Sequence, residues 1–150
     1  MERHKTALLF DKFGDDVFRL AFSYLGNRYD AEDVCQCVFT KLLERDVTLT
    51  EGKEKAFLLT CTANECKNLL RSFWRKNVGE IDDSLAFESD GDKDIWNAVM
   101  TLPKKYRVVV HLYFYEGYSQ NEIADILKIS VSAVQTRMSR AKKLLLKELD

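Results

Sequence analysis

Little in this sequence of 150 residues would break a helix. It contains a single proline, Pro103, and only six glycines. Proline fixes φ and removes a backbone donor, so its near absence leaves long segments free to be helical. No run of alternating apolar and polar residues indicates a strand. The sequence therefore predicts an all-α fold.

Segments that would direct the chain to a membrane are also missing. No apolar run approaches the roughly 20 residues that span a bilayer. The first residues, MERHKTALLFDKFGDD, have neither the apolar core nor the small-residue cleavage site of a signal peptide. With 46% hydrophobic and 31% charged residues, we expect a cytoplasmic protein with packed cores.

Signatures of catalysis and metal binding are absent too. The sequence has no P-loop, nucleophile motif or metal-ligand spacing. The cysteine spacings are C-x-C and C-x4-C, neither of which is the usual C-x2-C of zinc sites. We interpret the cysteines as small hydrophobic residues in a reducing compartment, with metal binding or redox sensing as the alternative. They are Cys35, Cys37, Cys61 and Cys66. The sequence predicts no enzyme, no metal and no cofactor.

The formal net charge of −1 conceals an uneven distribution. Residues 77–100 carry seven acidic groups and one basic group, whereas residues 101–150 carry nine basic groups and five acidic ones. Local fields, rather than net charge, govern contact with nucleic acid. The C-terminal third therefore has the charge expected of a DNA-binding segment.

A helix-turn-helix pattern occupies residues 118–146, YSQNEIADILKISVSAVQTRMSRAKKLLL. Ser119 and Glu122 have the spacing of a capping box at the start of a first helix. Lys128-Ile129-Ser130 would form the turn, and Ser130 is placed to cap a second helix. In proteins with this motif, the second helix enters the major groove of DNA.

The second of these helices has one apolar and one cationic face. Its inward positions recur at i, i+4, i+7 and i+11 and are Val134, Met138, Ala141 and Leu145. The opposite face carries small or cationic side chains that suit bases and phosphates: Ala133, Thr136, Arg137 and Arg140. An ordinary solvated helix is the alternative, but such helices usually mix both signs of charge. No acidic residue lies between Val131 and Lys147.

Helical periodicity divides the rest of the chain. We expect helices over Lys5–Leu25, Asp30–Arg45, Glu54–Lys76 and Asp94–Thr101, and another from Pro103 to Gly117. Asp30 would cap the second of them. Residues 77–94 are acidic and contain two glycines, which favours a linker. The prediction is two small helical domains, residues 1–76 and 95–150, joined by an acidic linker over residues 77–94.

A polar stripe follows the helix predicted over Glu54–Lys76. Its members lie three or four residues apart and are Thr60, Asn64, Asn68, Arg71 and Arg75. Asparagine is unfavourable within a helix, so two on one face suggest a role. Amides can bond bases and arginines can hold phosphates, although a solvated face is the alternative.

The helix predicted over Asp30–Arg45 exposes acids, an amide and an unexpected thiol: Glu32, Asp33, Gln36, Cys37 and Thr40. A thiol on an outer face is unusual. A protein docking surface is one interpretation of this face, and the signal is weak by itself.

These stretches resemble bacterial extracytoplasmic-function (ECF) sigma factors, in order. DAEDVCQCVFTKLLE at Asp30–Glu44 is similar to the DAEDLVQEVFLRLW-type signature of that family. KAFLLTCTANECKNLLR at Lys55–Arg71 resembles the following helix, close to WLYRIARNLALDLLR. The stretch from Leu102 to Leu145 is similar to the family's C-terminal domain, including its GTVKSRLSRAR-like segment.

The resemblance implies a promoter-specificity subunit that binds core RNA polymerase. Residues expected to dock on the polymerase are Asp30, Glu32, Asp33, Gln36 and Thr40. Asn64 and Asn68 would meet the −10 element, where the loop at residues 46–53 helps to enclose a flipped base, and Arg71 and Arg75 would hold phosphates. Residues expected to face the −35 element are Ser132, Ala133, Gln135, Thr136, Arg137 and Arg140. An anti-sigma factor is a common partner in the family.

The sequence departs from the family at several of these positions. Cys37 replaces a common glutamate, and Phe57 replaces a frequent tryptophan. Thr60 and Ala63 replace frequent basic residues, and Ser132-Ala133 replaces a common Gly-Thr pair. The alternative function is a helix-turn-helix regulator that does not replace a sigma factor. Such a regulator would bind duplex DNA without polymerase.

Overall fold

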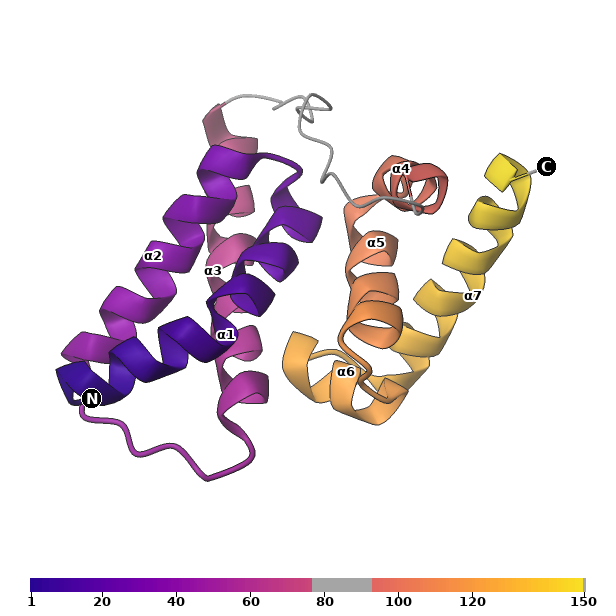
Figure 1. Ribbon diagram of the computed structural model, residues 1–150. Helices are drawn as coiled ribbons and strands as arrows, with labels where there is room; N and C mark the ends of the chain where they lie inside the picture. Colours follow the sequence, from indigo (N-terminus) through magenta and orange to yellow (C-terminus); the bar gives the residue numbers. More distant parts are fainter. Residues whose placement is uncertain (77–92, 150) are drawn as a thin grey trace.

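A computed structural model shows the chain as a bundle of helices (Figure 1). The structure describes residues 1–76 and 93–149, and the side chains of residues 1–72 and 97–147. The elements are α1 (Arg3–Leu25), α2 (Arg28–Glu44), α3 (Glu54–Lys76), α4 (Lys93–Thr101), α5 (Lys104–Val110), the π-helix η1 (His111–Tyr115), α6 (Gln120–Leu127) and α7 (Val131–Leu149). No strand occurs in these ranges, and the all-α prediction is confirmed. Most of the predicted linker, residues 77–92, lies outside the described residues.

The turn between α1 and α2 is shorter than the sequence predicted. Gly26 ends α1 in the left-handed conformation at φ 65°, which glycine adopts without a Cβ clash. Asn27 then caps α2, its side-chain oxygen accepting from the backbone N–H groups of Tyr29 at 2.8 Å and Asp30 at 3.2 Å. The prediction that Asp30 caps this helix is wrong, because the Asn27 side chain already satisfies these first donors.

The helix predicted from Pro103 to Gly117 changes type along its length. Pro103 is the N-cap residue rather than the first helical residue, and α5 gives way to η1 after Val110. A π-helix has more residues per turn than an α-helix, so the positions that follow rotate away from the α-helical pattern. Tyr113 lies four residues after buried Val109, a spacing that would turn it inward in an α-helix, but it is 40% exposed.

The helix-turn-helix forms as the sequence predicted. The Ser119 hydroxyl accepts from the backbone N–H of Glu122, and the Glu122 carboxylate accepts from the backbone N–H of Ser119, completing the capping box. Lys128 makes the turn in the left-handed conformation at φ 56°. The Ser130 hydroxyl accepts from the N–H of Ala133 at 3.0 Å and caps α7.

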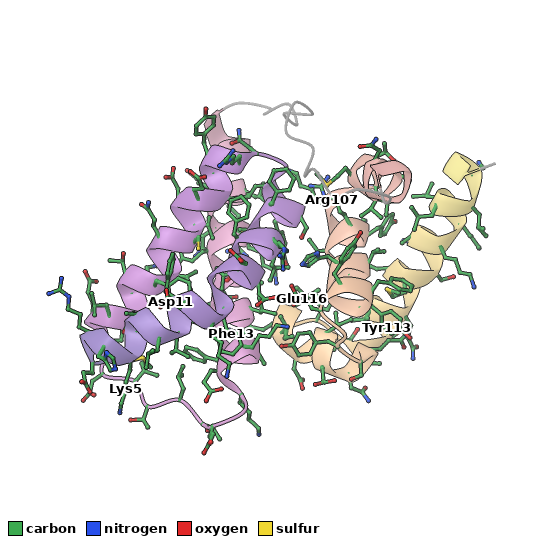
Figure 2. The ribbon with its side chains drawn as sticks, viewed as in Figure 1. Lys5, Asp11, Phe13, Arg107, Tyr113 and Glu116 are labelled. Carbon is green, nitrogen blue, oxygen red and sulfur yellow. The ribbon has the colours of Figure 1, made fainter. Side chains whose placement is uncertain are left out.

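One apolar core runs through both halves of the described chain. It joins residues of α1, α2 and α3 to residues of α5, η1, α6 and α7, including Leu20, Leu58, Val109, Ile123 and Val134. A smaller cluster of Val99, Leu102, Val110 and Ala141 packs α4 against α5 and α7. In Figure 2 the side chains of Arg107 and Glu116 lie where the two halves meet. None of the described helices is long and apolar enough to cross a membrane.

Candidate nucleic-acid interface

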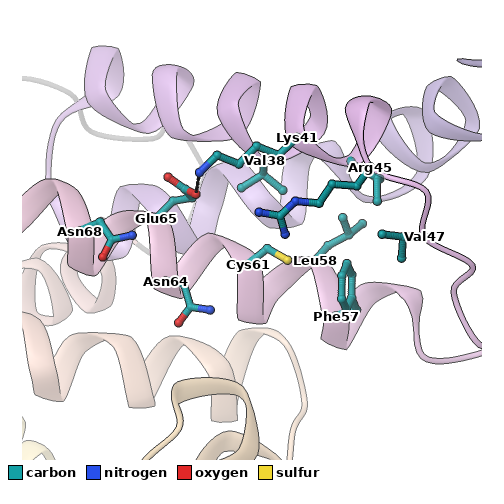
Figure 3. A pocket seen from close by; sticks show the side chains of 11 residues that line it. Val38, Lys41, Arg45, Val47, Phe57, Leu58, Cys61, Asn64, Glu65 and Asn68 are labelled. Atoms are coloured by element: carbon teal, nitrogen blue, oxygen red, sulfur yellow. Dashed lines mark hydrogen bonds and ion pairs between the residues drawn. The ribbon is translucent and has the colours of Figure 1, made fainter. Parts of the chain in front are cut away.

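A pocket of about 250 Å³ opens between α2 and α3, beside the loop that joins them (Figure 3). Its apolar part includes the side chains of Val38, Leu42, Val47, Phe57 and Leu58. Its polar part is formed by Lys41, Arg45, Asn64, Glu65 and Asn68, with Cys61 between the two parts. Apolar walls with a polar edge suit a heteroaromatic ring that carries hydrogen-bonding groups.

The polar stripe predicted on α3 leads into this pocket. Asn64 is half-buried and Asn68 is exposed, and both line the pocket, whereas Arg71 is exposed farther along the helix. The hydroxyl of half-buried Thr60 donates to the Ala56 carbonyl at 3.0 Å. The side chain of Arg75 lies outside the described residues. The structure thus brings together the two amides that the sequence singled out.

Three residues that sequence reasoning did not connect support the pocket wall. The Lys41 ammonium donates to Oε1 of Glu65, and the Cys37 thiol lies 3.5 Å from Oε2 as its donor. Cys37 is therefore half-buried against α3, and the expectation that it lies on the outer face is wrong. No pattern in the sequence indicated this arrangement, because it depends on how α2 packs against α3.

The outer face of α2 carries the residues that the resemblance assigned to polymerase. Glu32, Asp33, Gln36 and Thr40 are exposed. Asp30 is half-buried, and its pKa is raised by burial and by the nearby Asp33. This face is separate from the pocket, because the pocket is lined by other residues of α2.

The N-terminal part of α7 presents the residues assigned to the −35 element. Ser132, Gln135, Thr136 and Arg140 are exposed, whereas Ala133 and Arg137 are half-buried. Val134 and Ala141 face the core at 0% exposure, as the periodicity predicted. The expected outward face therefore exists, with two of its members partly covered.

Arg107 joins the C-terminal half to the end of α1. Its side chain is completely buried, and its guanidinium donates to the backbone carbonyls of Ser23, of Tyr24 at 3.3 Å and of Met100 at 3.2 Å. The last carbonyls of a helix have no partner within the helix. Arg107 therefore satisfies acceptors at the end of α1 from the opposite half of the molecule.

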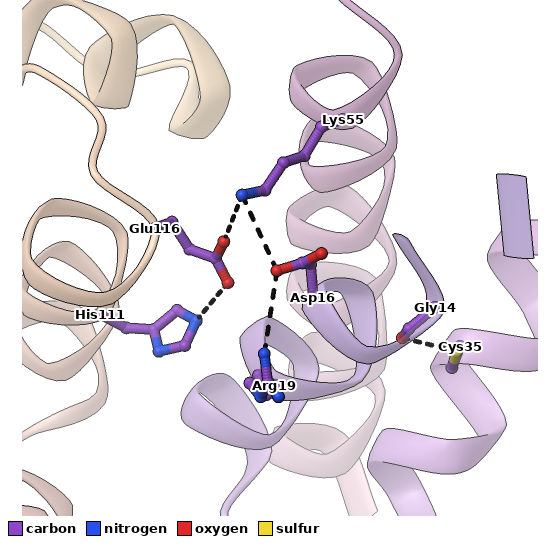
Figure 4. Close-up of polar contacts among 7 residues, drawn as sticks. All are labelled: Gly14, Asp16, Arg19, Cys35, Lys55, His111 and Glu116. Carbon is purple, nitrogen blue, oxygen red and sulfur yellow. Dashed lines mark hydrogen bonds and ion pairs between the residues drawn. The ribbon is translucent and has the colours of Figure 1, made fainter. Parts of the chain in front are cut away.

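A network of charged groups forms a second junction (Figure 4). Lys55 of α3 lies 2.7 Å from Oε2 of Glu116 and 3.7 Å from Oδ1 of Asp16, and His111 lies 3.3 Å from Oε1 of Glu116. Burial opposes ionisation of Glu116, but the contacts with His111 and Lys55 outweigh it and lower its pKa to about 2. Burial and the Glu116 carboxylate together raise the pKa of Asp16.

Cations meet at a third junction, between α3 and the helix-turn-helix. The Lys67 ammonium donates to the carbonyl of Leu127, the last residue of α6, at 2.5 Å. Burial lowers the pKa of Lys67, and the nearby charges of Arg137 and Lys128 lower it further. The side chain of Arg137 is therefore close enough to the N-terminal half to influence it electrostatically.

No group of three or more histidine, cysteine or acidic side chains suited to a metal occurs in the described part of the chain. The four cysteines are free thiols. Burial is the main cause of a raised pKa at Cys35, Cys37, Cys61 and Cys66.

Comparison with known proteins agrees with this architecture. Residues 9–76 match the family model of sigma-70 region 2, and residues 92–145 match that of sigma-70 region 4. The chain is 32% identical to the RNA polymerase sigma factor SigV of Bacillus subtilis, over 87% of this chain and 82% of the relative. It is 27% identical to the ECF RNA polymerase sigma factor SigX of the same species, over 95% and 82% of the two chains.

Solved structures share the fold. The sigma factor RpoE of Bartonella quintana, crystallised in complex with the anti-sigma factor NepR, matches with a TM-score of 0.80 and 22% identity over 95% of each chain. CnrH, solved in complex with the cytosolic domain of CnrY, matches with a TM-score of 0.70 and 23% identity over 99% of this chain and 90% of that one.

Two helical regions in this order, the second with a helix-turn-helix, define a DNA-binding transcription initiation factor. The chain belongs to the sigma-70 family, in its ECF group, and directs promoter-specific initiation by RNA polymerase. Because both regions match, a helix-turn-helix regulator that does not replace a sigma factor is not favoured.

Proposed function

We propose that residues 1–76 act as a domain that docks on core polymerase and reads the −10 element, and that residues 95–150 act as a domain that reads the −35 element. Residues 77–94 would join them. The observation that carries this proposal is the pocket between α2 and α3, which unites Asn64 and Asn68 beside an apolar wall.

The pocket is proposed to hold one base extruded from the −10 element. An extruded base loses stacking and pairing at a cost of a few kcal/mol, which a fitted pocket can offset. Phe57 is 37% exposed at the pocket and can stack on the base. Asn64 and Asn68 would bond bases, and Arg71 and Arg75 would hold phosphates of the displaced strand.

The outward face of α7 is proposed to enter the major groove at the −35 element. Ser132, Ala133, Gln135 and Thr136 would lie against bases, and Arg137 and Arg140 against bases or phosphates. The capped start of α7 supports this role, because backbone N–H groups at a helix N-terminus favour phosphate.

The exposed face of α2 is proposed to bind core polymerase through Asp30, Glu32, Asp33, Gln36 and Thr40. Three of these side chains are acidic, so a basic surface on the polymerase would complement them. The protein would act without catalytic groups of its own, in the cytoplasm where polymerase and DNA are found. The solved structure of RpoE bound to the anti-sigma factor NepR supports a partner of that kind for this chain.

Run-off transcription tests the proposal. Core polymerase free of sigma factors would be supplied with the chain, or with Asp33→Lys or Arg137→Ala, on fragments of the chain's own genome. We expect discrete transcripts that require the chain and are lost with both variants. Asp11→Lys and Lys5→Ala, which change exposed charges on α1, are the matched controls and should preserve the transcripts. Transcripts unaffected by Asp33→Lys would contradict the docking assignment.

A further inference from the structure

An acidic side chain lies on the wall of the pocket that we propose for DNA. Glu65 lines it between Asn64 and Asn68, and 20% of its side chain is exposed. Phosphate repels carboxylates, so an acid at a DNA surface needs a compensating interaction. That interaction identifies a further role for Glu65.

The Glu65 carboxylate is held from the side of α2. Lys41 donates to one oxygen, as Figure 3 shows, and Cys37 donates to the other. An ionised carboxylate has about four acceptor sites, so two donors leave further sites unused. Burial and the Glu65 carboxylate both raise the pKa of Cys37, which keeps this thiol protonated as a donor. Lys41 and Cys37 therefore orient an acceptor at the pocket.

Bases differ in what they offer to such an acceptor. Cytosine, adenine and guanine each carry an exocyclic amine that donates hydrogen bonds. Thymine carries carbonyl oxygens at its exocyclic positions and has a single ring donor, N3–H, between them. A carboxylate accepts freely from an exocyclic amine, whereas at the N3–H of thymine it would lie beside two carbonyl oxygens that repel it. Asn64 and Asn68 can each donate or accept, so they do not impose this choice.

We propose that Glu65 is a specificity-determining residue, which accepts a hydrogen bond from the exocyclic amine of the extruded base and selects an amino-bearing base over thymine. The inference rests on the proposed function of the pocket. It assigns Lys41 and Cys37 as positioning residues for the carboxylate.

A purely structural role for Glu65 makes a different prediction. If the Lys41–Glu65 pair only tied α2 to α3, then its loss would weaken binding equally for every base. A test must therefore measure the coupling between Glu65 and a single amine. A change in overall affinity is not sufficient.

The first step locates the base. Holoenzyme assembled from core polymerase and the full chain would be bound to promoter DNA with a preformed bubble over the −10 element. Single abasic sites would be introduced along the displaced strand. Removing the base that occupies the pocket should weaken DNA binding by the wild-type holoenzyme. The same removal should have little effect on DNA binding by the Phe57→Ala holoenzyme, which has already lost the stacking contact.

The second step removes only the amine at that position. Cytosine would be replaced by 2-pyrimidinone, adenine by purine, or guanine by hypoxanthine. We expect the wild-type holoenzyme to bind about tenfold more weakly without the amine, and Glu65→Met to bind both DNAs equally. Glu44→Met is the matched control, because it removes an exposed acid at the end of α2, outside the pocket. It should keep the tenfold difference.

The outcomes separate the two proposals. If no position along the strand is coupled to Phe57, both the pocket and the role of Glu65 are overturned. A coupled position that holds thymine, or an amine whose removal affects wild type and Glu65→Met equally, would leave the pocket standing and overturn the role of Glu65. Glu65→Gln adds a further check, because its amide can donate to a carbonyl oxygen and should improve binding of thymine.

Discussion

Lys55 of α3 and Glu116, which follows η1, form an ion pair of 2.7 Å between the two halves of the chain. The Glu116 side chain is only 4% exposed, and His111 and Asp16 lie in the same network. A buried charge is costly unless it is paired, so this carboxylate stabilises the junction only while its partners remain in place.

Acid should weaken this junction. The pKa of Glu116 is lowered from 4.5 to about 2, so its contribution to stability is complete above about pH 4.5 and is lost as the pH falls toward 2. We expect Glu116→Gln to lower the free energy of unfolding by on the order of 2 kcal/mol at pH 7 and by much less near pH 2. Urea denaturation of both proteins across this pH range measures the difference. A difference that did not vary with pH would contradict the prediction.

Shortening Arg107 should destabilise the packing of the C-terminal half on α1. Arg107→Lys keeps the charge but cannot bond the carbonyls of Ser23, Tyr24 and Met100 together. We expect a loss of about 2 kcal/mol in the free energy of unfolding, because hydrogen bonds to charged groups contribute about 1.5–3 kcal/mol each. Lys105→Arg, at an exposed position of α5, should leave the stability unchanged in the same urea titration.

Arg137 should contribute to the salt dependence of promoter binding. Each phosphate contact changes the slope of log affinity against log salt by about 0.9. Arg137→Ala is expected to reduce the magnitude of this slope by about 0.9 for a −35 duplex, the change for one phosphate contact. Lys5→Ala on α1 should not change the slope. Filter binding of the holoenzyme at several salt concentrations provides the slopes. If Arg137→Ala showed the same slope and the same base preference as the Lys5→Ala control, Arg137 would not contact the DNA.

The four thiols should react slowly. The pKa of each is raised, chiefly by burial, and alkylation requires the thiolate. We expect iodoacetamide at pH 7 to modify the native protein much more slowly than a small free thiol, as followed by mass spectrometry. Glu65→Gln should speed the reaction at Cys37, because it removes a carboxylate that raises the pKa of that thiol. Rapid labelling of native wild-type Cys37 would support the redox-sensing alternative instead.

Local signals explain what the sequence could predict. The bounds of α3, Glu54–Lys76, were predicted because apolar positions recur at helical spacing throughout it. The capping box of Ser119 and Glu122 depends only on neighbours in sequence, and it was predicted for the same reason. Asn64 and Asn68 were identified because amides are unusual within a helix.

The remaining features depend on contacts between distant residues. Arg107 and Lys55 have the sequence appearance of solvated cations, and nothing near them indicates a buried partner in the other half of the chain. The π-helical geometry of η1 leaves no periodic signal over its five residues, which is why α-helical spacing from Val109 does not predict the exposure of Tyr113. Glu65 could be placed in the pocket only once α2 and α3 had been packed together.

The packing of α6 against α3 limits which form of the chain can bind a whole promoter. The −10 and −35 elements are named for positions about 25 base pairs apart, which corresponds to about 85 Å along straight DNA at about 3.4 Å per base pair. In the structure described here, the helices proposed to read them share one core, so a single chain in this form cannot span both elements. Binding at both would require a separated form, and the fraction of molecules in that form would scale the apparent affinity for polymerase. The strength of the Arg107 contact, although remote from DNA, would then set the fraction of separated molecules and with it the level of transcription.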